Sequence, residues 1–458
     1  MIKAHIFLWI GLLTLTSYGQ QIEDVPINPL LIDRSFQEIK NPLVLNDFFQ
    51  KLQELESGNR SQVTVLQLGD SHVQGPYFPQ YIRQGLQNKF GNAGRGFVFP
   101  YRVAGTNGAV DVKFKASGDW KAVRNVKSNG DDDIGLSGIN LETANNDFLM
   151  EINLSESLEE VTEIKIVSPH PDRFKISLAD KRDLLLKVNI NKTYNVISGD
   201  YLGKIAAQFH TSIQKIQQVN GMKNTHLRAG QTLEIPTGNT QNKVLSEASF
   251  TDLASLDGIT YQIPKGVNQL YLRPAQKESK YLLDGLLLST GKNGINFHGI
   301  GVNGTKFSDY NIFPRFFDQM AALNPDLIII SLGTNESFYD TYTEEKLKEA
   351  MDVFNREMIQ REMTGSVLLT SPPPSMKNRK QINSTATAYA YEMGVFANLN
   401  SWAFYDLHSV SKTSRAMPYW HDANLTSSDK IHFLEKGYQL QALLLVESII
   451  NSYADYKK

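Results

Sequence analysis

The stretch that most constrains the fold is a short apolar run that leads directly into Gly69-Asp70-Ser71-His72. Residues 63–68 are mostly β-branched or aliphatic, the pattern of a parallel strand that is covered on both faces. In open α/β sheets such strands end at a crevice, where a glycine lets the chain turn sharply before a helix. Ser71 is then expected at that edge, and we interpret it as a nucleophile.

Composition narrows the class of protein. The chain has 458 residues, enough for about two to four domains, and 41% of them are hydrophobic, so it can bury real cores. A formal net charge of -2 gives no electrostatic reason to expect nucleic acid or an anionic membrane as a partner. The chain contains no cysteine, which excludes disulfides, a lipidated cysteine, cysteine metal sites and cysteine nucleophiles.

Residues 1–20 have the features of a signal peptide. Lys3 precedes an apolar run at 6–15, and small and polar residues follow, so we expect cleavage near Gly19 or Gln20 and export to the periplasm or the medium. The alternative is a membrane anchor, but the run is shorter than the roughly 18 apolar residues that a span needs. No other stretch qualifies, so no transmembrane segment is expected after cleavage. Residues 21–42 are polar and proline-containing, which predicts a linker.

Short alternating strands dominate two later segments of the chain. They recur over 109–192 and again over 238–288, separated by turn residues. This spacing predicts one β-sandwich whose sequence is interrupted in the middle.

The interruption, residues 193–237, has its own pattern. A strand, Gly199-Asp200, two short helical segments, Asn220-Gly221 and a Gly-Gln-x-Leu-x-Ile-Pro run from Gly230 follow in order. This order resembles a LysM module. Its small core would be filled by apolar residues at helical spacing, namely Ile205, Phe209, Ile213, Ile216 and Val219.

The LysM resemblance implies binding to polymers that contain N-acetylglucosamine, chiefly peptidoglycan or chitin. It places the sugar groove between two loops, which correspond here to Gly199, Asp200, Tyr201 and Leu202, and to Leu227, Arg228 and Gly230. The alternative is that these loops only form turns, since both glycines could serve the backbone alone. A single module of this kind would raise the local concentration of a polymeric substrate by tethering.

From residue 289 the chain returns to an α/β pattern with three polar features at strand ends. Gly304 follows a strand and would let a backbone N–H approach an oxyanion, although an ordinary turn explains it too. Asn335 follows the buried strand 326–332 and could donate its amide to a developing oxyanion, or simply stabilise a turn. Asp429 and His432 are three residues apart, which lets the carboxylate fix the imidazole tautomer.

Together, the Gly-Asp-Ser block, the glycine loop, Gly-x-Asn and Asp-x-x-His resemble the SGNH, or GDSL, hydrolase superfamily. The resemblance covers residues 60–105 and 290–455, within two hydrolase segments that we place at 43–108 and 289–458, and it implies a flavodoxin-like parallel-sheet sandwich. It implies that Ser71 is the nucleophile, His432 the general base and acid, and Asp429 its orienting group. The oxyanion hole would comprise the backbone N–H groups of Ser71 and Gly304 and the side chain of Asn335, with no metal or organic cofactor.

Two histidines near these blocks compete for the role of base. His421 and Asp422 form another His/acid pair, but they lack the glycine, tyrosine and terminal helix that follow His432, so they rank second. His72 adjoins the serine, but adjacent residues in a turn usually point apart. We therefore interpret His72 as a family marker.

The sequence leaves the substrate open. Gly-Asp-Ser-His with a β-sandwich between the serine and glycine blocks resembles the branch that contains peptidoglycan O-acetylesterases, and the LysM pattern agrees with it. Acetylesterases of other polysaccharides, such as xylan, and acetyltransferases that act on peptidoglycan would use the same triad. A non-catalytic wall-binding protein is the least favoured reading, because every catalytic block is intact.

Overall fold

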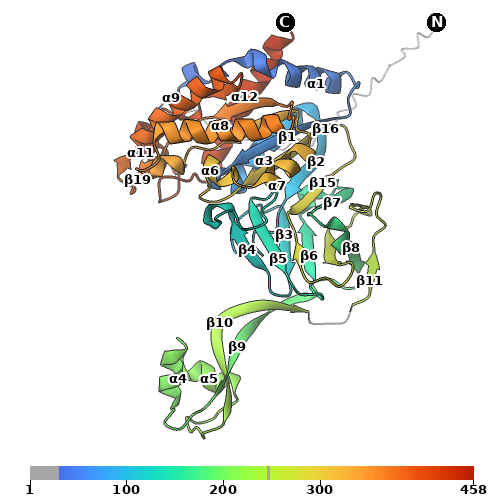
Figure 1. Ribbon diagram of the computed structural model, residues 1–458, viewed down its shortest axis with the longest axis vertical. Coiled ribbons are helices and arrows are strands. Elements are labelled where there is room, and N and C mark those ends of the chain that lie inside the picture. The colour runs from blue at the N-terminus through green and yellow to red at the C-terminus, as the bar shows by residue number, and fades with distance from the viewer. Residues whose placement is uncertain (1–29, 245–247) are drawn as a thin grey trace, which may run out of the picture.

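The computed structural model describes residues 30–244 and 248–458. The predicted signal peptide, 1–20, and the first part of the predicted linker lie outside the described residues. Figure 1 shows three parts along the long axis: an α/β part, a β-rich part beneath it, and a small module on a two-stranded ribbon. Within these two ranges, no helix combines the length and the apolar character needed to cross a membrane.

A nine-stranded sheet forms the framework of the α/β part, in the order β12-β7-β15-β2-β16-β1-β17-β18-β21. Six of its strands are parallel: β2 (Asn92–Val98), β16 (Gly294–Gly301), β1 (Gln62–Gly69), β17 (Leu327–Ser331), β18 (Ser366–Thr370) and β21 (Ala403–Tyr405). The strand that leads to Ser71 lies between β16 and β17. The loops after these three strands therefore meet at one edge of the sheet, because parallel strands end on the same side.

Helices cover both faces of this sheet. Val63 and Val65 of β1 are buried against α1 (Asn46–Glu56), α3 (Tyr77–Phe90) and α12 (Glu435–Tyr456). Leu66 and Leu68 face the opposite core, which contains α7 (Pro314–Ala322), α8 (Glu344–Gln360) and α9 (Ser384–Leu399). Burying each such side chain contributes about 1.5 to 3 kcal/mol, so β1 is held firmly from both sides.

The β-rich part shares a layer with the α/β part. Its five-stranded sheet has the order β11 (Phe250–Asp252), β8 (Phe174–Ala179), β13 (Gln269–Pro274), β6 (Met150–Leu154) and β3 (Val112–Ala116). The layer that packs against it consists of β7 (Glu163–Val167), β12 (Thr260–Gln262) and β15 (Gly285–Ser289), which continue the nine-stranded sheet because β15 pairs with β2. A three-stranded sheet contains β4 (Lys121–Arg124), β5 (Ile139–Thr143) and β14 (Tyr281–Leu282).

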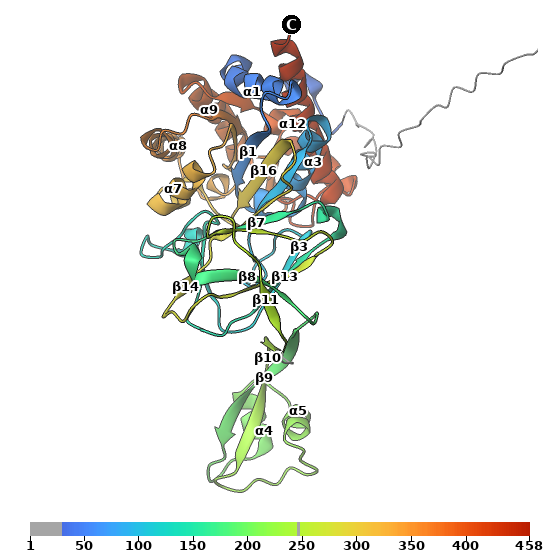
Figure 2. The same ribbon diagram turned by 90° about the vertical axis from the view of Figure 1, so that its right-hand side faces the viewer.

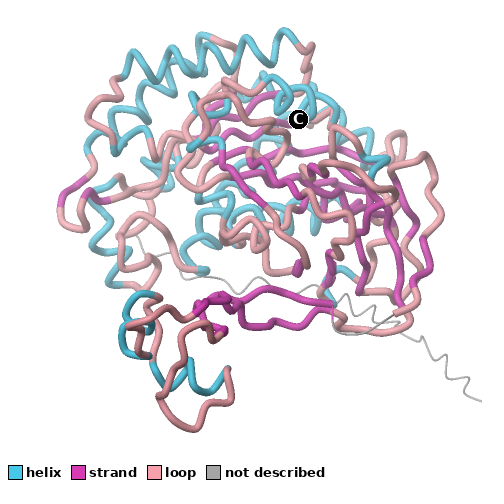
Figure 3. The backbone as a smooth tube through the Cα atoms, turned by 60° about the horizontal axis from the view of Figure 1, so that its bottom comes forward, coloured by secondary structure: helices cyan, strands magenta, loops and turns pink. Residues whose placement is uncertain are grey.

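The predicted LysM module is carried on a long antiparallel ribbon. The ribbon consists of β9 (Leu185–Asn195) and β10 (Thr232–Val244), and the module adds α4 (Leu202–Gln208) and α5 (Ile213–Val219). Figures 2 and 3 show the ribbon extending from the β-rich part, with both helices at its far end. Ile205 and Ile216 are fully buried, as predicted, but the expectation for Ile213 and Val219 was wrong, because they are 37% and 42% exposed.

Short elements complete the chain. They are α2 (Ser71–Gln74), α6 (Phe307–Tyr310), α10 (Leu407–Val410), α11 (Met417–Asp422), β19 (Met376–Lys377) and β20 (Gln381–Ile382), with 3-10 turns η1 (Arg34–Phe36), η2 (Pro42–Leu45), η3 (Asn125–Lys127), η4 (Glu156–Leu158), η5 (Pro171–Arg173), η6 (Glu336–Phe338) and η7 (Ser414–Ala416).

Candidate active site

Ser71 is the first residue of α2, at the carboxyl end of β1. The turn is tight at Gly69, where an added Cβ would lie 2.6 Å from the Ser331 carbonyl oxygen of the neighbouring strand. Asp70 caps the helix, because its Oδ1 accepts from the His72 N–H at 2.9 Å. The sharp turn and the cap together present the Ser71 hydroxyl at the sheet edge.

Three of the predicted site residues form one chain of hydrogen bonds. Ser71 Oγ lies 2.9 Å from His432 Nε2, and His432 Nδ1 lies 2.7 Å from Asp429 Oδ2. The imidazole therefore contacts the hydroxyl with one nitrogen and the carboxylate with the other. A carboxylate at Nδ1 favours the tautomer with its proton on Nδ1, which leaves Nε2 able to accept a proton from the serine hydroxyl.

The Asp429 carboxylate is held as an anion. Burial opposes its ionisation, but hydrogen bonds from His432, Ser427 and the backbone N–H groups of Ile431 and His432 outweigh that effect and hold its pKa below the ordinary range. The hydrogen bond to Asp429 in turn raises the pKa of His432 against the opposing effect of burial. A carboxylate in this position favours the protonated form of the His432 imidazole.

The predicted oxyanion donors gather beside this triad. In the described part of the chain, the backbone N–H groups of Ser71 and Gly304 have no hydrogen-bond partner. Gly304 has a φ of +86°, a conformation that favours glycine, in the loop after β16. Asn335 Nδ2 donates to the Thr305 carbonyl at 2.9 Å and has only a long 3.4 Å contact to Asp70 Oδ2, so its second hydrogen is available to a substrate oxygen.

His72 does not take part in the triad. Its Nδ1 lies 2.8 Å from the Tyr438 hydroxyl, and its ring centroid lies 5.3 Å from that of His432. Burial lowers the pKa of His72 well below its ordinary value, so the imidazole of His72 is neutral where it lies beside the His432 ring.

The competing pair, His421 and Asp422, is not arranged to act as a general base for Ser71. His421 Nδ1 contacts the Thr426 hydroxyl at 3.1 Å, and Asp422 is exposed. Among the described residues neither contacts Ser71.

Several residues around the site were not predicted. Asp70 is fully buried, and burial raises its pKa to about 6. Glu336 is also fully buried behind the oxyanion loop, where it accepts from the Phe307 N–H at 2.9 Å and where burial raises its pKa to about 7. Gln74 bonds to Asn303, the residue before Gly304. Nothing in the sequence around Gln74 indicates this contact, because Asn303 is 229 residues away along the chain.

The predicted LysM groove residues differ in their exposure. Tyr201 is 64% exposed, whereas Leu202 is buried in the core of the module. Asp200 accepts from Tyr194 Oη at 2.7 Å, from the Ile197 N–H at 3.0 Å and from Lys204 Nζ at 2.9 Å, so its carboxylate holds the loop together. The other loop is tied to the first strand, since the Gly230 N–H donates to the Val196 carbonyl at 2.7 Å. Gly199, Leu227 and Arg228 complete the set.

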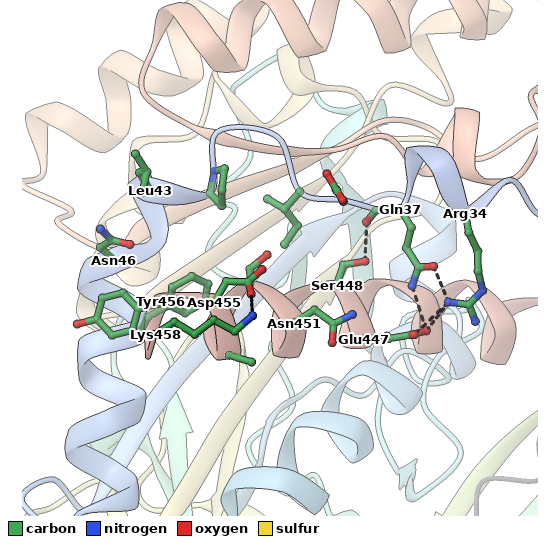
Figure 4. Close-up of a pocket in the computed structure, with 16 residues that line it drawn as sticks. Arg34, Gln37, Leu43, Asn46, Glu447, Ser448, Asn451, Asp455, Tyr456 and Lys458 are labelled. Carbon is green, nitrogen blue, oxygen red and sulfur yellow. Dashed lines mark hydrogen bonds and ion pairs between the residues drawn. The ribbon is translucent and has the colours of Figure 1, made fainter.

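A groove of about 710 Å³ lies elsewhere, between α12 and the N-terminal segment (Figure 4). Arg34 and Gln37 bond to Glu447 across it, and Tyr456 lines its other end. None of the predicted catalytic residues lines this groove. Over 30–244 and 248–458, no three His, Asp or Glu side chains are grouped as ligands for a metal ion.

Comparison with family models identifies two parts of the chain. Residues 194–236 match the LysM domain, and residues 257–440 match the GDSL-like Lipase/Acylhydrolase family. The second match includes Gly304, Asn335, Asp429 and His432 but begins after Ser71.

Two curated relatives are similar over part of the chain. N-acetylmuramoyl-L-alanine amidase sle1 of Staphylococcus saprophyticus is 28% identical over 160 residues, which is 31% of this chain and 48% of the relative. Membrane-bound lytic murein transglycosylase D of Escherichia coli is 26% identical over 111 residues, which is 22% of this chain and 23% of the relative. The chain therefore spans less than half the length of either relative.

A solved structure of a peptidoglycan O-acetylesterase has the same fold. It matches with a TM-score of 0.59 at 17% identity, covering 89% of this chain and 96% of that chain. The predicted fold class, an SGNH-type parallel-sheet sandwich with a β-sandwich and a LysM module inserted, is confirmed.

Proposed function

We propose that this chain, which joins a GDSL-like acylhydrolase domain to a LysM domain, is a serine esterase that removes O-acetyl groups from peptidoglycan. The observation that carries the proposal is the continuous hydrogen-bonded chain of Ser71, His432 and Asp429, beside two backbone N–H groups that have no partner among the described residues. This arrangement suits acyl transfer through a covalent acyl-serine.

The geometry supports a two-step reaction. In the first step His432 Nε2 takes the proton of Ser71, whose Oγ attacks the acetyl carbonyl, and the oxyanion accepts hydrogen bonds from Ser71, Gly304 and Asn335. The sugar oxygen leaves with the proton from His432. In the second step His432 takes a proton from water, which attacks the acetyl-serine, and His432 returns that proton to Ser71 Oγ as acetate leaves. Each oxyanion donor should contribute about 10²- to 10³-fold in turnover.

Peptidoglycan is supported by three separate features. The LysM domain belongs to a family that binds polymers of N-acetylglucosamine, the two curated relatives are by name an amidase and a murein transglycosylase, and the solved structure of like fold is a peptidoglycan O-acetylesterase. The ribbon places the module at a distance from the catalytic edge, which suits tethering to a polymer. With the signal-peptide pattern of residues 1–20, these features favour action outside the cytoplasm.

Ser71→Ala tests the nucleophile. The variant should release no acetate above background from a small acetyl ester or from O-acetylated peptidoglycan, while it binds insoluble peptidoglycan like the wild type. A serine-reactive sulfonyl fluoride should label the Ser71 peptide of the wild type, as read by mass spectrometry. Retained esterase activity in the variant would refute the assignment.

A further inference from the structure

The Asn303–Gly304 peptide unit is a critical part of the proposed oxyanion hole. Its N–H is the Gly304 donor, and its carbonyl, which belongs to Asn303, points the opposite way because the peptide is trans. The direction of the donor is therefore fixed by whatever holds Asn303. Gly304 itself offers no side chain for this, and its position in a left-handed turn leaves the peptide dependent on its neighbours.

Gln74 holds Asn303 from the nucleophile helix. Its Oε1 accepts from the Asn303 N–H at 2.6 Å, and its Nε2 donates to the Asn107 carbonyl at 2.6 Å and to the Thr106 hydroxyl at 3.0 Å. The Gln74 side chain is 98% buried, and both ends of its amide are bonded. Because Ser71 and Gln74 share the single turn of α2, this amide links one oxyanion donor to the loop that carries the other.

Asn303 is also held by the loop that precedes the β-rich part and by the β-rich part itself. Asn303 Nδ2 donates to Asn107 Oδ1 at 2.6 Å and to the Thr106 hydroxyl at 3.1 Å. The Asn303 carbonyl accepts from Arg124 Nη1 at 3.4 Å, a long contact from the end of β4. Arg124 has no carboxylate partner in the described part of the chain, so this carbonyl is the acceptor that its guanidinium faces.

We infer that Gln74 is a positioning residue, which sets the distance and direction between the Ser71 and Gly304 backbone N–H groups, with Arg124 supporting the same peptide from the β-rich part. This inference rests on the proposed serine esterase function. It gives the insertion a role in catalysis that is separate from sugar binding. A misplacement of about 1 Å in a catalytic group can cost about 10²-fold in rate. The hydrogen bonds that Gln74 and Arg124 make to Asn303, which we call the Asn303 clamp, can therefore affect the rate measurably.

Gln74→Met tests the inference, because methionine has a similar length and volume but neither end of the amide. We expect kcat and kcat/KM for a small acetyl ester to fall together by about 10- to 100-fold with KM unchanged, the signature of an interaction made in the transition state. The affinity for a boronic acid that forms a tetrahedral adduct with serine should fall in parallel. A purely structural glutamine would lower the melting temperature and leave these constants within about twofold in the folded protein.

Gln87→Met is the matched control. Gln87 is 92% buried and donates to the Gly94 and Ile295 carbonyls at 2.7 and 3.0 Å, and within the described ranges no hydrogen bond joins its side chain to residues 303–304. The Gln87→Met variant should be less stable than the wild type, with an unchanged kcat. If Gln74→Met and Gln87→Met have the same kcat, the positioning role is wrong.

A second pair of variants keeps the test decisive if Gln74→Met does not fold. Arg124 is only half-buried, so Arg124→Met should fold. Its kcat should fall about threefold to tenfold with KM unchanged, and Arg124→Lys should recover part of the loss. Equal kcat in wild type, Arg124→Met and Arg124→Lys would show that Arg124 does not support the Asn303–Gly304 peptide. The Asn303 clamp would then be wrong. An inactive wild type, or an active Ser71→Ala, would instead refute the esterase function on which the inference rests.

Discussion

Asp429→Asn removes one charge from the triad and keeps the size of the side chain. In the native protein, Asp429 Oδ2 accepts from His432 Nδ1, while Oδ1 accepts from Ser427 and from the backbone N–H groups of Ile431 and His432. An asparagine has a single acceptor oxygen, so it cannot satisfy both sets of donors. The imidazole then faces an amide N–H group, or the loop loses its acceptor.

Two effects contribute to the expected loss of kcat in Asp429→Asn. The imidazolium loses a charge-assisted hydrogen bond worth about 1.5 to 3 kcal/mol, and the exposed fractions of 39% and 35% for the two side chains place the loss near the lower figure, about tenfold in rate. The wrong imidazole tautomer accounts for the larger share, since the equivalent change in a serine protease triad costs about 10⁴-fold. We therefore expect kcat to fall about 10³- to 10⁴-fold.

The pH dependence gives a second readout of the same change. Because Asp429 raises the pKa of His432 and the attack needs a neutral imidazole, wild-type kcat/KM should fall as the pH drops through that raised pKa. Without the carboxylate, this fall in kcat/KM, which is the acidic limb of the pH profile, should occur at a lower pH. The assay is acetate release across pH for the wild type and Asp429→Asn, with Asp422→Asn as the control that leaves rate and limb unchanged. If kcat of Asp429→Asn falls less than tenfold and the pH dependence of kcat/KM is unchanged, Asp429 neither orients nor stabilises the His432 imidazole.

Further predictions concern the oxyanion hole, a buried acid and the LysM module. Asn335→Ala should lower kcat by about 10²- to 10³-fold with little change in KM, as measured by acetate release; an unchanged kcat would remove Asn335 from the oxyanion hole. Because burial raises the Asp70 pKa to about 6, the folded protein binds this proton more tightly than the unfolded chain, so stability should fall as the pH rises from about 4 to 6. Asp70→Asn should remove about 1 to 3 kcal/mol of that difference in urea unfolding, and an identical pH slope in both proteins would contradict it. Replacing residues 194–233 with Asn-Gly joins the paired Thr193 and Glu234 by a two-residue turn. It should spare turnover of a small ester and reduce binding to insoluble peptidoglycan, whereas equal binding would argue against the tethering role.

The sequence predicts the residues whose chemistry depends on their type and their place at strand ends. Ser71 and His432 are 361 positions apart, yet both follow from short local patterns, and the structure brings them to hydrogen-bonding distance. Gln74 could not be predicted in the same way, because its role comes from partners at 106–107 and 303 that only the folded loops bring together. A glutamine three residues after a serine carries no signal of its own.

The sequence could not predict which strands pair at the edge of the sheet, for a similar reason. Strands at 163–167 and 285–289 have the alternation of a sandwich, and their pattern does not say which neighbour they join. In the structure Leu286 pairs with Val98, which makes one continuous sheet of the two parts. The exposure of Ile213 and Val219 has another cause: α4 and α5 are each seven residues long, so a small module can cover only one face of them.

The proposed removal of acetyl groups from peptidoglycan is tested most directly by comparing two substrates under identical conditions. Wild type and Ser71→Ala are incubated with O-acetylated peptidoglycan or with acetylated xylan, each with an added acceptor sugar, and both free acetate and acetylated acceptor are measured. We expect the wild type to release free acetate from peptidoglycan at a higher kcat/KM than from xylan, and Ser71→Ala to release none. Faster release from xylan would contradict the substrate, and acetylated acceptor in place of free acetate would contradict hydrolysis.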